Sequence, residues 1–166
     1  MPEEYLDLVN ENDEVIGRKK RSDIYTEGLS NYRAINLFIV NSKGEMWIPR
    51  RTANKNIFPL CLDMSMGGHV KSGETYEEGL KREIEEELNI DIDQTPSETL
   101  GHLTPKKDGV SCYMNVYKII TNNTPDYNKE DFIESFWLKP EEILRLIDEG
   151  EKAKDDLPRI IRKFFI

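Results

Sequence analysis

Three glutamates in the middle of the chain have the spacing of a metal-binding site. Glu83, Glu86 and Glu87 lie three and four residues apart, so on a helix with 3.6 residues per turn they share one face. At a separation of about 5–6 Å, two such charges repel by roughly 3 kcal/mol if the effective dielectric is near 20. On a solvated helix the cluster would be an ordinary charge run. In a cleft it would require a cation, and carboxylate oxygens suit magnesium or manganese better than zinc.

The local sequence marks both ends of this helix. Thr75 and Glu78 have the spacing of a capping box, in which each side chain accepts a hydrogen bond from a free backbone N–H of the other residue. Asn89 can adopt the left-handed conformation with which helices commonly end. Between these ends an apolar residue recurs at every fourth position: Tyr76, Leu80, Ile84 and Leu88. The pattern predicts a helix with an apolar stripe on the core and an acidic face beside it.

Residues 68–90 resemble the signature of the Nudix hydrolases, G-x5-E-x7-R-E-U-x-E-E-x-G-U, in which U is an aliphatic residue. The matching residues are Gly68, Glu74, Arg82, Glu83, Ile84, Glu86, Glu87 and Ile90. Only the last glycine differs, because Asn89 occupies its position. Since asparagine tolerates the same left-handed backbone, the helix can still end there.

The resemblance implies a role for each residue of the signature. In the family the helix binds a divalent metal ion, which holds a diphosphate while water attacks one phosphorus. The implied metal ligands are the backbone carbonyl of Gly68 and the carboxylates of Glu83, Glu86 and Glu87. Arg82 would orient the glutamates, and Glu74 would hold Arg82. The implied cofactor is Mg²⁺ or Mn²⁺.

Charged residues outside the signature are candidates for proton transfer and for phosphate binding. Family members take the general base either from the helix or from a later loop, and the candidates here are Glu83, Glu130, Asp131 and Glu134. Arg50, Arg51 and Lys55 follow a predicted strand and precede the catalytic loop, where cations can reach substrate phosphates. For each of the three taken singly, a surface residue at a strand end is an equally good interpretation.

A wider resemblance supplies a rival activity. Residues 6–137 are similar to Nudix proteins related to isopentenyl-diphosphate isomerase, in the segments DLVNENDEVIG, YRAINLFIVNSKGEMWIPRR and FPLCLDMSMGGHV. The isomerases carry a catalytic cysteine where this chain has Gly67 and a metal-binding histidine where it has Tyr32. The missing groups favour hydrolysis over isomerisation. A noncatalytic diphosphate-binding or protein-interaction domain is a third interpretation, against which the complete acidic set argues.

Five other aromatic or reactive residues are interpreted mainly as structural. Tyr32 and Phe58 could stack on a base, but core packing is favoured. Cys61 is expected to be a buried structural cysteine. His69 is expected to be structural or to contact the residues that bind the ligand without binding the ligand itself, and His102 is expected to have no role.

Predicted strands surround the central helix. Strands are expected at residues 5–9, 14–18, 31–41, 45–50, 60–66, 97–103, 110–120 and 134–138, and further helices at 141–149 and from about 155 to the C-terminus. This order indicates an α+β fold, in agreement with the α/β/α sandwich with a mixed sheet that the Nudix resemblance implies. We predict one domain over residues 1–166, with a hairpin in 1–20, the signature in 68–90 and two helices in 140–166.

Charge and composition restrict the partners. The net charge of -9 over 166 residues argues against binding to polymeric nucleic acid or an anionic membrane, whereas a metal ion and a few arginines can still attract a small phosphorylated ligand. Two cysteines without metal-ligand spacing, no signal-peptide pattern and no bilayer-spanning apolar run indicate a soluble, cytoplasmic protein. We therefore expect a Mg²⁺- or Mn²⁺-dependent hydrolase of a diphosphate linkage in a small nucleoside-diphosphate-type substrate. A homodimer is compatible with the sequence.

Overall fold

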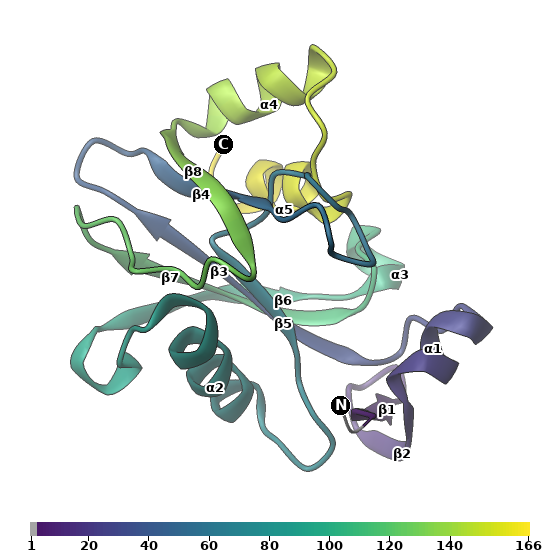
Figure 1. The fold of residues 1–166 in the computed structure, drawn as a ribbon. Coiled ribbons are helices and arrows are strands. Elements are labelled where there is room, and N and C mark those ends of the chain that lie inside the picture. Colours follow the sequence, from purple (N-terminus) through teal and green to yellow (C-terminus); the bar gives the residue numbers. More distant parts are fainter. Residues whose placement is uncertain (1–2) are drawn as a thin grey trace.

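Strand β3 lies at the centre of a mixed sheet in the computed structural model, which describes residues 3–166 (Figure 1). Within these residues the sheet consists of β3 (Arg33–Val40), β4 (Met46–Arg51), β5 (Met66–His69), β6 (Ser97–Leu103), β7 (Tyr113–Ile120) and β8 (Phe132–Leu138). β3 pairs in parallel with β7 along its whole length and antiparallel with β4 and β5. β6 and β8 form the two edges. The expected mixed sheet is confirmed.

The alternation of side chains along β3 creates two cores. Ile35, Leu37 and Ile39 are fully buried on the face that is covered by helix α2 (Tyr76–Leu88). Phe38 is buried on the other face, in the core that also contains residues of α4 (Pro140–Asp148) and α5 (Asp156–Phe164). Because successive residues of a strand point to opposite faces, helices are needed on both sides. Figure 1 shows α2 on one side of the sheet and α4 and α5 on the other, which is the predicted sandwich.

Helix α2 begins and ends where the sequence predicts. The backbone N–H of Glu78 donates to Thr75 Oγ1 and the N–H of Thr75 donates to Glu78 Oε1, each at 3.1 Å, which completes the capping box. Asn89 ends the helix in the left-handed conformation, with φ at 54°. Gly79 packs near the preceding loop, where a Cβ would make an ordinary van der Waals contact with Val70 Cγ2 at 3.4 Å. The acidic helix is thus seated closely against the loop that precedes it.

The N-terminal unit, residues 3–30, lies beside the main sheet (Figure 1). Its strands β1 (Tyr5–Val9) and β2 (Val15–Lys20) form a two-stranded antiparallel sheet, which confirms the predicted hairpin, and β1 also makes an isolated bridge from Leu6 to Lys71. Helix α1 (Arg21–Glu27) follows and ends at Gly28. The sequence analysis missed α1 because the helix contains one fully buried apolar residue, Ile24, and so has little periodicity.

The strand expected at residues 60–66 is wrong. Leu60 has a positive φ of 60°, which an extended strand does not allow. Ser65 is fully buried, donates its hydroxyl to a carbonyl of β4 and accepts an N–H of β3, so the segment is held as a loop. The strand comes later, as β5, and includes the two glycines Gly67 and Gly68 that pair with β3. Because glycine has no side chain, the strand can be extended here while the side chains of Asn36 and Glu83 pack directly against its backbone.

The remaining elements are short or C-terminal. The one-turn helices η1 (Ile92–Gln94) and α3 (Pro105–Asp108) are too short for periodicity to predict. The two predicted C-terminal helices are confirmed as α4 and α5. Ile160 and Ile161 are fully buried, and Phe165 packs on Phe38 with ring centroids 5.1 Å apart, so the apolar residues of this segment are core contacts, as expected.

Substitution of Gly101 tests the contact between β6 and α5. A Cβ at Gly101 would lie 2.9 Å from two ring carbons of Phe164, so we expect Gly101→Ala to lower the free energy of unfolding by about 1–2 kcal/mol through overpacking. Gly17→Ala on β2 is the matched control, because a Cβ there meets nothing within 4 Å. Urea denaturation compares the two variants. Equal stabilities would contradict close packing of α5 on this strand.

Candidate functional site

A cavity of about 440 Å³ opens beside the signature loop. Its lining includes the signature residues Gly68, Glu83 and Glu87, the last residue of β4, Arg51, and Lys55 in the following loop. Three lining residues come from distant parts of the chain: Arg21, Tyr25 and Lys154. A volume in this range suits a small-molecule ligand. The fold thus gathers acidic and basic groups from at least four segments around one space.

Arg82 connects the acidic helix to the loop before it. Its Nε and Nη2 donate to the two carboxylate oxygens of Glu74 at 2.8 and 3.0 Å, and its Nη1 donates to Glu83 Oε1 at 2.6 Å. Nη2 also donates to the carbonyl of His69 at 3.0 Å. Burial alone would raise the pKa of Glu74, but the bonds from Arg82 and from the Lys71 amide lower it below its usual value. Arg82 therefore stays paired with charged carboxylates and fixes the loop against the helix.

The side chain of Glu83 packs directly against Gly68. A Cβ at this position would lie 2.5 Å from Glu83 Cδ and 2.8 Å from its Oε2, so only glycine leaves room for the carboxylate. Arg82 holds Oε1, and Oε2 therefore faces the Gly68 backbone. Burial raises the pKa of Glu83, although the bond from Arg82 opposes this shift.

Glu87 contributes a buried oxygen that nothing satisfies. Its Oε2 is inaccessible and has no hydrogen-bond partner within residues 3–166. Burial raises the pKa of Glu87 well above its usual value, and the negative charges of Glu83, Asp131 and Asp63 add to the effect. Such an oxygen is costly unless a cation or a proton compensates it.

The carboxylates fit a divalent cation by their chemistry. In the described part of the chain no three His, Cys, Asp or Glu side chains already surround one point, and the side chain of Glu86 is 59% exposed, 3.6 Å from Arg82 Nη1. Nevertheless, the unsatisfied Glu87 oxygen and the buried Glu83 lie on one cavity, and an ion with oxygen ligands would offset both charges. The residues that would hold it are Glu83, Glu86 and Glu87, with the Gly68 carbonyl.

Five of the predicted site residues are not among those that line the cavity: the signature residues Glu74, Arg82 and Glu86, together with Arg50 and Glu134. Arg50 on β4 pairs with Glu134 on the adjacent strand β8, and its Nη2 lies 2.6 Å from Glu151 Oε1. Neither Arg50 nor Glu134 is among the residues that line the cavity. Their roles in phosphate binding and proton transfer stay predictions, and the ion pairs give both residues a structural role.

Arg51 and Lys55 line the cavity but have protein partners. Arg51 Nη1 donates to Asp63 Oδ2 at 2.9 Å, and its other nitrogens donate to the carbonyls of Ile57 and Phe58 at 2.9–3.1 Å. Lys55 Nζ donates to Asp131 Oδ1 at 2.7 Å. Arg51 therefore holds the loop that forms one wall of the cavity.

The sequence analysis missed a wall of aromatic and basic residues. The hydroxyl of Tyr25 lies 2.6 Å from His69 Nε2, and the rings of Tyr25, Tyr32 and His69 contact one another with centroids 5.6–6.2 Å apart. Tyr32 is buried, as expected, and its ring also lines the cavity. Burial lowers the pKa of His69 to about 3, with contributions from the charges of Arg21, Lys154 and Arg82, so the imidazole is neutral. No motif distinguishes Arg21 or Lys154 from other surface cations, so spacing alone could not have found them.

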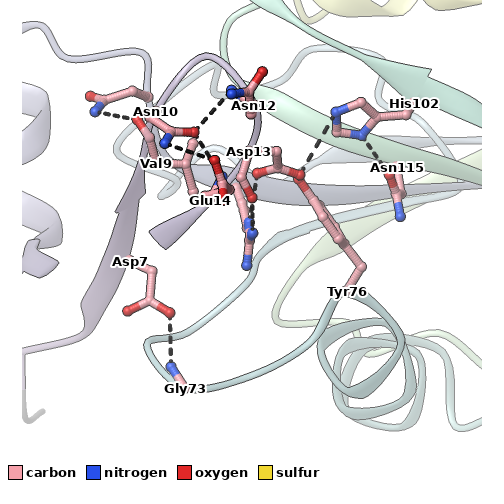
Figure 2. A network of polar contacts seen from close by, with 12 residues as sticks. Asp7, Val9, Asn10, Asn12, Asp13, Glu14, Gly73, Tyr76, His102 and Asn115 are labelled. Carbon is pink, nitrogen blue, oxygen red and sulfur yellow. Dashed lines mark hydrogen bonds and ion pairs between the residues drawn. The ribbon is translucent and has the colours of Figure 1, made fainter. Parts of the chain in front are cut away.

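Asp13 joins the N-terminal unit to the signature helix (Figure 2). Tyr76, the first residue of α2, donates its hydroxyl to Asp13 Oδ2 at 2.7 Å, and Arg33 Nε donates to Asp13 Oδ1 at 2.8 Å. His102 Nε2 lies 3.7 Å from Asp13 Oδ2, and its Nδ1 lies 2.7 Å from Asn115 Oδ1. The His102 ring thus belongs to this network of contacts, and the expectation that it has no role in the site stays a prediction.

Asp7 makes a second connection, to the loop of the signature. Its carboxylate accepts the hydroxyl of Ser72 at 2.7 Å and the backbone N–H of Gly73 at 3.1 Å (Figure 2). The Ser72 N–H also donates to the carbonyl of Tyr5 at 2.8 Å. The N-terminal unit therefore supports both the loop and the first turn of the acidic helix.

The Asp13 connection can be tested with Tyr76→Phe. This change removes the hydroxyl that bonds a buried carboxylate but keeps the ring, over which the Arg33 guanidinium lies 5.1 Å from the centroid. We expect the free energy of unfolding to fall by about 1–2 kcal/mol, measured by urea denaturation. Tyr5→Phe, at a tyrosine that is 39% exposed, is the control. A variant as stable as the control would mean that the bond contributes nothing.

Comparison with known proteins identifies the family. A NUDIX domain model matches residues 31–160. An uncharacterized Nudix hydrolase of Nostoc sp. is 57% identical over 162 residues, which are 98% of this chain and 96% of that protein. A Nudix hydrolase of Deinococcus radiodurans is 44% identical over 163 residues, covering 98% of this chain and 95% of that protein.

Solved structures agree with this assignment. The crystal structure of DR0079 from Deinococcus radiodurans has a TM-score of 0.93 and 44% identity, covering 98% of this chain and 100% of that chain. A MutT protein from Methanosarcina mazei shares the fold with a TM-score of 0.59 at 21% identity, covering 80% of this chain and 91% of that chain. With the family model over most of its length and relatives similar from end to end, this chain belongs to the Nudix hydrolase family.

Proposed function

We propose that the protein hydrolyses a diphosphate linkage in a small substrate of the nucleoside-diphosphate type, with Mg²⁺ or Mn²⁺ as cofactor. The observation that carries the proposal is the cavity beside Gly68, where Glu83 and the unsatisfied Glu87 oxygen face a space that also has basic walls. Nudix hydrolases generally use divalent cations and act on small molecules. The acidic face of α2 would supply the metal ligands of such a site, and the basic residues around it would bind the substrate phosphates.

The chain's own residues would position the reactants. When bound, a divalent cation would neutralise the diphosphate and acidify a water molecule. Arg82, held by the two bonds that it donates to Glu74, would keep Glu83 Oε1 in place and leave Oε2 free at the Gly68 backbone. Of the candidate bases, Glu83 lines the cavity, whereas Asp131 is paired with Lys55. We therefore assign proton acceptance from the attacking water to Glu83 Oε2.

Isomerisation is disfavoured by the surroundings of Gly67. A Cβ at this position would lie 2.7 Å from Asn36 Oδ1, so a cysteine would require Asn36 to move. Tyr32, at the position of the isomerase histidine, has a phenol whose pKa burial raises further, so it is a poor metal ligand. These contacts support the hydrolase within the isomerase-like Nudix group. The buried oxygen of Glu87 likewise supports catalysis over a purely structural domain, because a protein-binding module has no need of it.

We also propose that the protein works in the cytoplasm. Cys61 and Cys112 are both unpaired and buried, which suits a reducing compartment. Within residues 3–166 no helix has the length and apolar character that crossing a bilayer requires.

A substrate panel tests the proposed function. Nucleotides, nucleotide sugars, dinucleoside polyphosphates and isoprenoid diphosphates are incubated with Mg²⁺ or Mn²⁺, and the products are separated by chromatography. We expect hydrolysis of at least one diphosphate, and a loss of kcat by about 10²-fold or more in Glu83→Gln, because a general base contributes that much. Glu86→Gln should also lose activity.

The matched control for these variants is Glu85→Gln. Glu85 is exposed on the same helix at a variable position of the signature and does not line the cavity, so its substitution removes an equal charge from outside the site. Hydrolysis of none of the compounds, or equal activity of Glu86→Gln and Glu85→Gln, would refute the proposal. Conversion of isopentenyl to dimethylallyl diphosphate would instead revive the isomerase.

A further inference from the structure

We propose that Arg21 and Lys154 form an anion subsite in the cavity, which binds a phosphate group of the substrate. The inference rests on the proposed function, since the phosphate is taken to belong to the diphosphate substrate. It assigns phosphate binding to two residues from opposite ends of the chain, in addition to the cations that the sequence predicts at the end of β4.

The cations of the cavity differ in how fully they are paired. Arg51 and Lys55 each donate to a carboxylate, at 2.9 and 2.7 Å, within normal hydrogen-bond length. Arg21 Nη1 lies 3.7 Å from Glu4 Oε2, and Lys154 Nζ lies 3.7 Å from Asp63 Oδ1. At these distances a substrate oxygen can take over the donors without breaking a short bond. Arg21 and Lys154 are therefore the cations best able to accept a ligand.

Both cations act on the same place beside the signature loop. Arg21 and Lys154 both line the cavity beside this loop. The Arg21 guanidinium lies 5.5 Å from the ring centroid of Tyr25, and the Tyr25 hydroxyl lies 2.6 Å from Nε2 of His69, the residue after Gly68. A Cβ at Gly67 would lie 3.8 Å from Lys154 Nζ, which places the ammonium group close to β5. The anion subsite thus adjoins the acidic site.

The acidic groups nearby do not cancel this pair. Asp156 accepts the hydroxyl and the N–H of Ser111. Asp63 Oδ2 accepts a bond from Arg51 at 2.9 Å, whereas its buried Oδ1 has no hydrogen-bond partner within residues 3–166 and lies 3.7 Å from Lys154 Nζ. Glu4 is loosely shared between Arg21 and Lys71, at 3.7 and 3.8 Å. Arg21 is further positioned by Tyr25, since its guanidinium lies 5.5 Å from the ring centroid. A chain with a net charge of -9 needs local cations of this kind to admit a diphosphate.

The position of Arg21 links the subsite to substrate choice. The NUDIX domain model matches residues 31–160, so the N-terminal unit lies outside the matched segment although it lines the cavity. Asp7 and Asp13 tie this unit to the signature loop and helix, which keeps Arg21 at a defined distance from the acidic face. Loops and added segments, and not the conserved chemistry, usually decide which leaving group a fold accepts. Arg21 is thus a specificity-determining residue of this protein.

The test measures binding of inorganic diphosphate by calorimetry, in the presence of a chelator so that neither metal nor turnover is needed. We expect Arg21→Gln and Lys154→Gln each to weaken the affinity by about tenfold, the effect of losing one charge-assisted hydrogen bond. The controls Lys20→Gln and Lys152→Gln remove the same charge from exposed neighbours and should stay within about twofold of wild type. Arg21→Lys, which keeps the charge, should bind more tightly than Arg21→Gln.

Equal affinities of Arg21→Gln and Lys20→Gln, or no binding of inorganic diphosphate by the wild type, would overturn the subsite. Thermal unfolding of each variant shows that it is folded, and Arg21→Lys provides the comparison if the glutamine variant is unstable. The result is independent of the substrate panel. Affinity that depends on Arg21 without hydrolysis of any compound would refute the proposed function and keep the subsite, whereas hydrolysis without this dependence would do the reverse.

Discussion

The hydrogen bonds of Arg82 are the interaction on which the site depends. One guanidinium group joins the carboxylate of Glu74, the carboxylate of Glu83 and the carbonyl of His69. Without this positive charge, the buried Glu83 would lose the contact that opposes the effect of burial on its pKa. A buried charge without a partner is costly, so the loop and the helix hold their relative position only while Arg82 connects them. The other elements of the fold place further charged residues around the loop and the helix that Arg82 holds together.

Two features maintain the geometry around Arg82. Strand β5 pairs with β3 through Gly67 and Gly68, which places the loop at the centre of the sheet and leaves room for Glu83. From outside, the N-terminal unit bonds to the loop through Asp7 and to the first turn of α2 through Asp13 (Figure 2). The signature is thus supported from both sides, and a segment far away in the sequence becomes a wall of the cavity.

The electrostatics of the cavity explain how an acidic protein can bind a polyanion. Burial raises the pKa of Glu83 and Glu87, so their charges are held at a cost that a divalent cation would offset. The basic residues on the other walls come from separate segments, and several of them are already paired with acids. The field inside the cavity therefore depends on which cations are paired, and the net charge of the chain does not describe it.

The sequence by itself determined the signature helix. Its capping box, its left-handed end at Asn89 and the spacing of its glutamates depend on residues within one or two helical turns of one another, and the structure has all three. The α+β order of elements and the C-terminal helices could also be predicted, because alternation and helical periodicity are local patterns, whereas the sandwich was implied by the resemblance to the Nudix family.

Only the tertiary structure decided which cations and acids share the cavity. Arg50 and Arg51 are adjacent in sequence, yet the pairing of β4 with β8 directs Arg50 to Glu134, while Arg51 lines the cavity. Arg21 and Lys154 line the same cavity although they lie near opposite ends of the chain, and no local sequence pattern predicts this proximity. Strand register and the docking of the N-terminal unit are long-range packing results, so a single sequence without contacts could not reveal them.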